Sequence, residues 1–316
     1  MSQSIRQAVM QASQAWIADF NRQAFADCIA RYLPGAQMQV SPFGRFEGIE
    51  AIGQFWLGFA QQNPGELVYR NVEIKVLSDR QAILSANWRM NIASGFISKE
   101  LWTLADDGHW YLQEDDFSVL TQLSEPLAPQ MRSALVLVDL QNDYFKGGRF
   151  ALDNCEQAAA NAAKLLHHFR TNRLPVIHVQ HIFKDPEASF FQAGTQGVEI
   201  ADIVAPKGNE PVIVKHHVDS FIDTALSQTL VELGIDKLVV VGAMAQACVQ
   251  TLCRSAVKAG FECEVISDAI AAPSLSWESQ DLSGEQLVAA NLISLSFGGA
   301  KAVSLDDWLV RERLAG

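Results

Sequence analysis

The feature that most constrains this chain is a regular alternation of short apolar runs and longer helix-like segments after residue 132. The first run, ALVLVDL at 134–140, is rich in β-branched residues, as expected of a strand buried on both faces. Similar runs occur at 176–181, 212–215, 237–241, 261–267 and 302–305, with helical patterns at 155–171, 221–233, 247–259 and 284–296. This order predicts a three-layer α/β fold with a parallel six-stranded sheet.

The first 122 residues have a different order, with helical patterns first and strand patterns after them. Helical spacing occurs at 5–21, 24–32 and 48–61, and strand-like runs at 36–41, 68–77, 81–92, 95–104 and 110–119. Asp106-Asp107-Gly108 is a strong hairpin signal between the last two strands. Helices followed by a run of strands predict an α+β domain.

Between these regions lies SEPLAPQ at 124–130, which has two prolines and no periodicity. Prolines stop helices and favour extended backbone, so we expect a linker at 123–132. A chain of 316 residues also exceeds the usual size of one core. We therefore expect two domains, 1–122 and 133–316.

The composition excludes several classes of protein. The formal net charge of −12 disfavours nucleic acid, because neutralising phosphates needs a basic surface. No apolar run approaches the ~20 residues of a membrane span, and 1–14 lacks the layout of a secretory signal. The cysteines form no CxxC pair and are odd in number, so we expect neither disulfides nor a zinc knuckle, and a cytoplasmic location. They are Cys28, Cys155, Cys248, Cys253 and Cys263.

Three ends of the predicted parallel strands carry reactive side chains, namely Asp139, Lys215 and Cys248. The carboxyl ends of parallel strands form the usual ligand crevice. A helix start and the Lys215 ammonium would lower the pKa of the Cys248 thiol, and Asp139 would act as the base. Each residue also has a purely structural interpretation: a buried small hydrophobe, a surface lysine, or an aspartate that caps a turn.

Four segments in order resemble the isochorismatase-like cysteine hydrolases over residues 131–316. They are ALVLVDLQNDYF (134–145), FQAGTQGVEI (191–200), VKHHVDSF (214–221) and LVVVGAMAQACVQTLCRSAVKAGFECEVISDA (238–269). The resemblance implies a catalytic triad of Asp139, Lys215 and Cys248. It also implies a cis peptide between Ala243 and Met244, with the amides of Met244 and Cys248 forming an oxyanion hole.

The family often has Thr and Asp where this chain has Ala245 and Gln246, which alters the loop but not the triad. His178 and His181 do not reproduce the histidine spacing of the metal-dependent nicotinamidase branch, so we expect no catalytic metal and no cofactor. The substrate is expected to be a small molecule. Candidate pocket residues are Gln141, Tyr144, Phe145, His181, Phe190, Phe191 and Phe221.

With a cysteine nucleophile, the reaction implied is hydrolysis of an amide-type (or carbamoyl) C–N bond through a thioester. True isochorismatases cleave a vinyl ether and lack this nucleophile, so that reaction is disfavoured. Two alternatives stay open: a catalytically silent binding or scaffold protein that keeps the fold, and a bifunctional enzyme with a second activity in the N-terminal domain.

The N-terminal region resembles the SnoaL-like, nuclear-transport-factor-2-like proteins in AWIADFNRQAFADCIARYLPGAQMQVSPFGRFEGIEAIGQFW (15–56) and ELWTLADDGHWYLQEDDFS (100–118). The resemblance implies a cone, made of a curved antiparallel sheet with helices, and homo-oligomerisation. Asp115 and Asp116 are a candidate acid/base pair, although strand alternation lets only one face the hollow. The tryptophans are expected in the core or the wall: Trp16, Trp56, Trp88 and Trp102.

Overall fold

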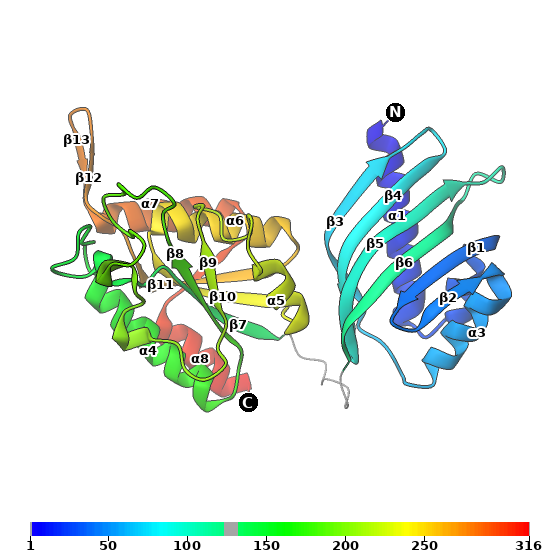
Figure 1. Ribbon diagram of the computed structural model, residues 1–316, viewed down its shortest axis with the longest axis horizontal. Coiled ribbons are helices and arrows are strands. Elements are labelled where there is room, and N and C mark those ends of the chain that lie inside the picture. Colours follow the sequence, from blue (N-terminus) through cyan, green and yellow to red (C-terminus); the bar gives the residue numbers. More distant parts are fainter. Residues whose placement is uncertain (1, 123–131, 316) are drawn as a thin grey trace. The chain divides into compact units, whose positions relative to one another are not determined.

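The computed structural model describes residues 2–122 and 132–315 (Figure 1). The chain separates into two compact units, Met1–Gln130 and Met131–Gly316, and each is considered by itself. The predicted linker lies outside the described residues, apart from Arg132. Across the part of the chain that is described, no helix is both long and apolar enough to cross a membrane.

Over the described residues 2–122, the N-terminal unit consists of one six-stranded sheet and three helices. The elements are α1 (Ser2–Asn21), α2 (Phe25–Ala30), β1 (Tyr32–Ser41), β2 (Gly44–Glu47), α3 (Gly48–Ala60), β3 (Val68–Val76), β4 (Gln81–Arg89), β5 (Ala93–Leu104) and β6 (Trp110–Gln122). The strand order is β2-β1-β6-β5-β4-β3. Burial alternates along β4, so one face of the sheet packs into the core with the helices.

The sheet of this unit is mixed, so the prediction of an antiparallel sheet was wrong at one pairing. Strands β3 to β6 form an antiparallel meander, but β1 lies parallel to β6, with Val40 beside Phe117. No tight turn joins β1 to β6; the chain passes through β2, α3 and the whole meander between them. Such a long connection permits a parallel pair, and no local pattern reveals it.

The C-terminal unit contains the predicted parallel six-stranded sheet, which is confirmed. Its strands are β7 (Ser133–Val138), β8 (Val176–His181), β9 (Val212–Lys215), β10 (Lys237–Ala243), β11 (Glu262–Ala271) and β14 (Lys301–Val303), in the order β14-β11-β10-β7-β8-β9. Every neighbouring pair in it is parallel. The longer helices are α4 (Cys155–Thr171), α5 (Leu226–Glu232), α6 (Gln250–Lys258), α7 (Gly284–Phe297) and α8 (Leu305–Ala315). Short elements complete it: η1 (Asn142–Tyr144), η2 (Gln196–Val198), η3 (Asp202–Val204), η4 (Ala245–Val249), β12 (Leu275–Trp277) and β13 (Gln280–Leu282).

Helices cover both faces of this sheet (Figure 1). Along β7, Val136 and Val138 belong to the core shared with α5, α6 and α7, whereas Leu135 and Leu137 belong to the core shared with α4 and α8. Alternate residues of one strand thus pack into different layers, which explains why β7 is apolar throughout. The strand order of the sheet reverses its direction between β7 and β10, and ligand crevices of open α/β sheets form at such a reversal.

Gly242 near the end of β10 allows the close approach of β7. Its φ is +124°, and an added Cβ would overlap the backbone carbonyl of Val138. Only glycine adopts this conformation at low cost, and any side chain here would push apart the two strands whose ends carry Asp139 and Cys248.

We expect Gly242→Ala to reduce the free energy of unfolding by about 3 kcal/mol, because it combines backbone strain with steric overlap. Gly208→Ala is the matched control: its φ is +58°, but a Cβ there would meet nothing within 4 Å. Strain alone should cost about 1 kcal/mol there. Urea denaturation measures both values, and equal losses would contradict the close-approach argument.

Candidate active site

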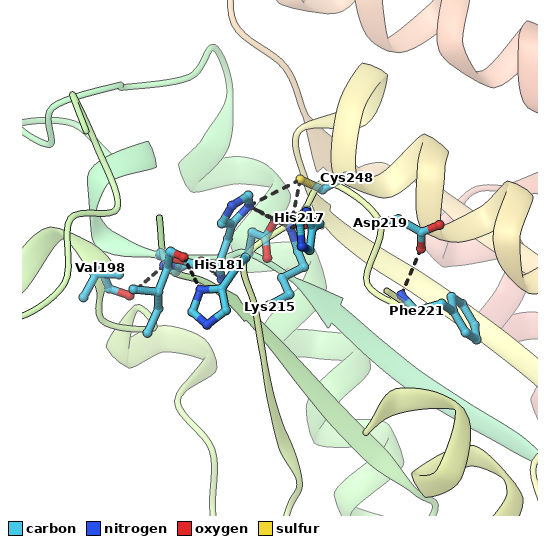
Figure 2. Close-up of polar contacts among 11 residues, drawn as sticks. His181, Val198, Lys215, His217, Asp219, Phe221 and Cys248 are labelled. Atoms are coloured by element: carbon cyan, nitrogen blue, oxygen red, sulfur yellow. Dashed lines mark hydrogen bonds and ion pairs between the residues drawn. The ribbon is translucent and has the colours of Figure 1, made fainter. Parts of the chain in front are cut away.

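The ends of three strands bring Asp139, Lys215 and Cys248 together. Lys215 closes β9, and its Nζ lies 2.9 Å from Oδ2 of Asp139, which follows β7. The same Nζ donates to Sγ of Cys248, in the turn after β10, at 3.1 Å (Figure 2). The ammonium therefore bridges the carboxylate and the sulfur.

His181, the last residue of β8, completes the surroundings of the ammonium. Its Nδ1 lies 2.8 Å from Nζ of Lys215 and 4.0 Å from Sγ of Cys248 (Figure 2). The carbonyl oxygen of His217 also accepts from Nζ, at 3.1 Å. An ammonium has only protons to offer, so Nδ1 of His181 is the acceptor and Nε2 carries the ring proton. No protein group among the described residues accepts from that buried Nε2.

These side chains are removed from solvent: Asp139 and Lys215 are 0% exposed, and Cys248 and His181 only 3%. Burial raises the pKa of Asp139 more than the Lys215 charge lowers it. Burial lowers the pKa of Lys215, but Asp139 and Cys248 outweigh it, so the pKa is raised and the amine is charged. Burial, with the Lys215 charge, lowers the pKa of His181 to about 3, so this ring is neutral.

The structure corrects one sequence-based expectation, the lowered pKa of the Cys248 thiol. Burial and the Asp139 charge raise that pKa, and Lys215 offsets them only in part. Lys215 is already paired with the carboxylate, so its charge is not free to stabilise a thiolate. In the resting state Cys248 is therefore a thiol, with a carboxylate beside it to receive the proton.

Three potential metal ligands, Asp139, His181 and Cys248, place their donor atoms within 4.8 Å of one another. The Lys215 ammonium, however, lies within 3.1 Å of an atom of each. A metal ion would have to displace this buried cation, so the donor set does not fit a metal well. The other histidine of β8, His178, points elsewhere, and its Nε2 lies 3.0 Å from Glu210. The absence of a metal stays a prediction.

Gln141 holds the end of β8 in place. Its Nε2 donates to the carbonyl oxygens of His181, at 2.8 Å, and Val198, at 2.7 Å, and its Oε1 accepts from the His181 amide. Both amide protons of this fully buried side chain are used. Gln141 was expected in the substrate pocket, but these bonds make it a positioning residue for His181.

The turn that carries Cys248 begins at a cis peptide between Ala243 and Met244. The next residues, Ala245–Val249, form a single π-helical turn that continues into α6. The Met244 carbonyl accepts from the amides of Ala247, at 3.1 Å, and Val249, at 3.2 Å, the two neighbours of Cys248 in the chain. This turn brings the start of the helix and the sulfur to the same edge of the sheet.

Most of the predicted pocket aromatics lie in one cluster. Tyr144, Phe145, Phe190 and Phe191 pack with Met244, and His181 lies 4.4 Å from the ring of Phe183 at the edge of the cluster. Phe221 is separate: it packs on the central core, 6.4 Å from Phe261, and Figure 2 shows it on the far side of Asp219. Phe150 and Phe183 also belong to the cluster but were not predicted from the sequence; only Phe183 had a signal, two residues after His181.

Asp143 is a further supporting residue that was not predicted from the sequence. It is buried, and its carboxylate accepts from the amides of Phe191, at 2.7 Å, and Arg149, at 3.2 Å. Gly197 lies against it so closely that a Cβ would overlap the carboxylate. Asp143 therefore joins the loop that carries Phe190 and Phe191, the aromatic loop, to the segment after β7. This role explains the aspartate four residues after Asp139.

Comparison with known proteins identifies the family of the C-terminal unit. A family model described as "Isochorismatase domain" matches residues 133–296. The chain belongs to the isochorismatase family. An uncharacterised family member of Bacillus subtilis, YddQ, is 46% identical over 166 residues, covering 52% of this chain and 92% of that protein.

Two further members of the family are informative. A crystal structure of an isochorismatase hydrolase from Oleispira antarctica is 40% identical, with a TM-score of 0.56, and covers 58% of this chain and 99% of that one. N-carbamoylsarcosine amidase of an Arthrobacter species is 26% identical over 147 residues, covering 41% of this chain and 56% of that protein. The family match begins at residue 133 and does not cover residues 1–122, so the SnoaL-like character of those residues stays a prediction.

We expect Asp139→Asn to lower the pKa of the Cys248 thiol and to increase its thiolate fraction about tenfold at alkaline pH, because it removes a negative charge and frees Lys215. Thiolate ultraviolet absorbance measures this without requiring a reagent to reach the buried sulfur, and Cys248→Ala provides the baseline for the other cysteines. Lys215→Met should act in the opposite direction. An unchanged titration in both variants would contradict the assignment of these charges.

Proposed function

We propose that the protein hydrolyses an amide-type C–N bond of a small molecule, with Cys248 as the nucleophile. The observation that carries the proposal is the Lys215 ammonium held between Asp139 and Cys248. In this arrangement Asp139 is the proposed base for the Cys248 thiol. Both lie at the edge of the sheet where ligand crevices form in such folds. The amidase among the relatives supports a C–N bond, since its printed name is that of an enzyme of this kind.

In the first half of the proposed reaction, Asp139 takes the proton of the Cys248 thiol as Sγ attacks the substrate carbonyl carbon. The tetrahedral intermediate then collapses: the C–N bond breaks and Asp139 passes the proton to the leaving nitrogen. The products are a thioester on Cys248 and a free amine or ammonia. The raised pKa of Asp139 suits a group that must both receive and return a proton near neutral pH.

In the second half, Asp139 takes a proton from a water molecule, which attacks the thioester. Sγ leaves, regains the proton, and the carboxylic acid (or carbamic acid) is released. The Met244 and Cys248 amides are the proposed donors to the oxyanion in both halves. Throughout, Lys215 keeps its charge and stabilises the transient sulfur anion, while neutral His181 holds Lys215 in position.

The aromatic cluster beside Met244 is the proposed wall for the acyl part of the substrate. Phe190 is half-buried and presents apolar surface there, and it is backed by the buried rings of Tyr144 and Phe191, whose centroids lie 4.4 Å apart. Self-association and a cytoplasmic location remain part of the proposal, as predicted from the sequence.

The test is a screen of primary amides and N-carbamoyl compounds for release of ammonia. We expect Cys248→Ala to lower kcat on the order of 10³-fold or more, and Asp139→Asn to have a comparable effect. Added hydroxylamine should capture the acyl group of the thioester as a hydroxamate.

Cys253→Ala is the matched control, because Cys253 is a buried cysteine on the next turn of the same helix and lies outside the site. It should keep its activity. Turnover that survives in Cys248→Ala, or that yields no hydroxamate at any hydroxylamine concentration, would contradict the thioester route.

A further inference from the structure

The N-terminal unit encloses a cavity of about 310 Å³. Aromatic rings from α1, α3, β4 and β6 line it, among them Trp16, Trp56, Trp88 and Phe117. Trp56 stacks on Phe117 at 5.9 Å and meets Trp16 edge-on at 5.3 Å. The volume is at the lower end of the range for small-molecule pockets.

One carboxyl group faces this aromatic cavity. Asp115 of β6 is only 5% exposed and lines the wall. Tyr32 donates its hydroxyl to Oδ2 of Asp115 at 2.5 Å, and the indole N–H of Trp56 donates to that hydroxyl at 3.3 Å. These two hydrogen bonds in series hold the carboxyl group in place. Strand alternation turns the neighbouring Asp116 to the other face of the sheet.

A second buried carboxyl group lies directly opposite the first. Glu100 of β5 pairs in register with Asp115 and is 3% exposed. Its oxygens accept from Tyr69, at 2.9 Å, and from Trp102, at 2.8 Å. Acidic residues facing each other across two strands destabilise a sheet when both are charged. Burial, together with the neighbouring carboxyl, raises the pKa of Glu100 to about 8, and burial raises that of Asp115 to about 7.

Nothing in the wall compensates this negative charge. None of the described residues that line the cavity is a lysine, an arginine or a histidine. A buried carboxylate normally has a cationic partner, as Asp139 has in the other unit. The faces of the tryptophan rings also favour positive charge, because the negative pole of the ring quadrupole lies there. An anionic ligand would meet no cationic partner among the described residues that line this cavity.

We propose that this cavity binds a small organic cation, an alkyl- or aryl-ammonium compound, with Asp115 as its counter-ion and the tryptophan faces around it. The positive charge would supply the partner that Asp115 lacks, and the apolar groups on nitrogen would fill the aromatic space. This inference does not depend on the hydrolase chemistry of Cys248, since every residue in it belongs to the N-terminal unit.

The proposal fixes the sign of a pH effect. The titratable groups that surround Asp115 are Tyr32, Tyr69, Glu100 and Asp116. Burial raises the pKa of both tyrosines well above the usual value, so they stay neutral between pH 6 and 8, whereas Glu100 gains negative charge over this range. Asp115 is mostly neutral at pH 6 and mostly ionised at pH 8. A ligand with a permanent positive charge should therefore bind about tenfold more tightly at the higher pH.

The experiment titrates the full chain with phenyltrimethylammonium and with its uncharged isostere tert-butylbenzene, and follows tryptophan fluorescence. We expect saturable quenching by the cation, at least tenfold weaker quenching by the isostere, and tighter cation binding at pH 8 than at pH 6. Asp115→Asn should weaken cation binding at least tenfold while keeping the shape of the side chain. Asp116→Asn is the matched control and should leave it unchanged, as should Cys248→Ala.

Three results would overturn the proposal. Equal or tighter binding of tert-butylbenzene, or cation binding that weakens as pH rises, would show a cavity for neutral ligands. Unchanged cation affinity in Asp115→Asn, with its fold verified by circular dichroism, would remove the counter-ion. Absence of saturable quenching by the cation, although Ala93→Leu changes the fluorescence by filling the cavity, would show that the space is not a cation site.

Discussion

The buried Lys215 ammonium constrains how the strands of the C-terminal unit must end. Four groups from four strand ends meet on this one atom: Asp139, His181, Cys248 and the carbonyl of His217. A buried charge is tolerated only when it is paired and hydrogen-bonded, so the pairing requires the strands to end in register. The order β9-β8-β7-β10 supplies that register, and Gly242 keeps β7 and β10 close enough.

The same interaction determines how the cysteine can be activated. Because the charge of Lys215 is paired with Asp139, Lys215 only partly offsets the rise in the pKa of Cys248 that burial causes. In the mechanism we propose, the nucleophile is produced only when Asp139 takes the thiol proton on substrate binding, and the resting thiol is thereby protected from oxidation and alkylation. The supporting bonds of Gln141 and Asp143 matter because they hold His181 and the aromatic loop around this ion pair.

The buried carboxyl group of the candidate active site and those of the aromatic cavity have different kinds of partner. In the C-terminal unit, Asp139 has an internal cation at 2.9 Å. In the N-terminal unit, Asp115 and Glu100 have only hydroxyl and indole donors, so their pKa values are raised toward neutrality. Two buried carboxyl groups without a cationic partner reduce the stability of the unit. The cation that we propose to bind beside the aromatic faces would supply this partner.

Hydrophobic period and strand-end chemistry are local properties, so the sequence alone predicts the parallel sheet, most of the helices and strands around it, and the meeting of Asp139, Lys215 and Cys248. It did not predict α8. Four features follow from the folded arrangement alone: His181 lies beside Lys215, Gln141 holds the end of β8 instead of lining a pocket, Phe221 lies away from the site, and β1 is parallel to β6. These depend on contacts between residues far apart in the chain. The pKa of Cys248 was wrong in direction for the same reason, since desolvation and the prior pairing of Lys215 exist only after the chain has folded.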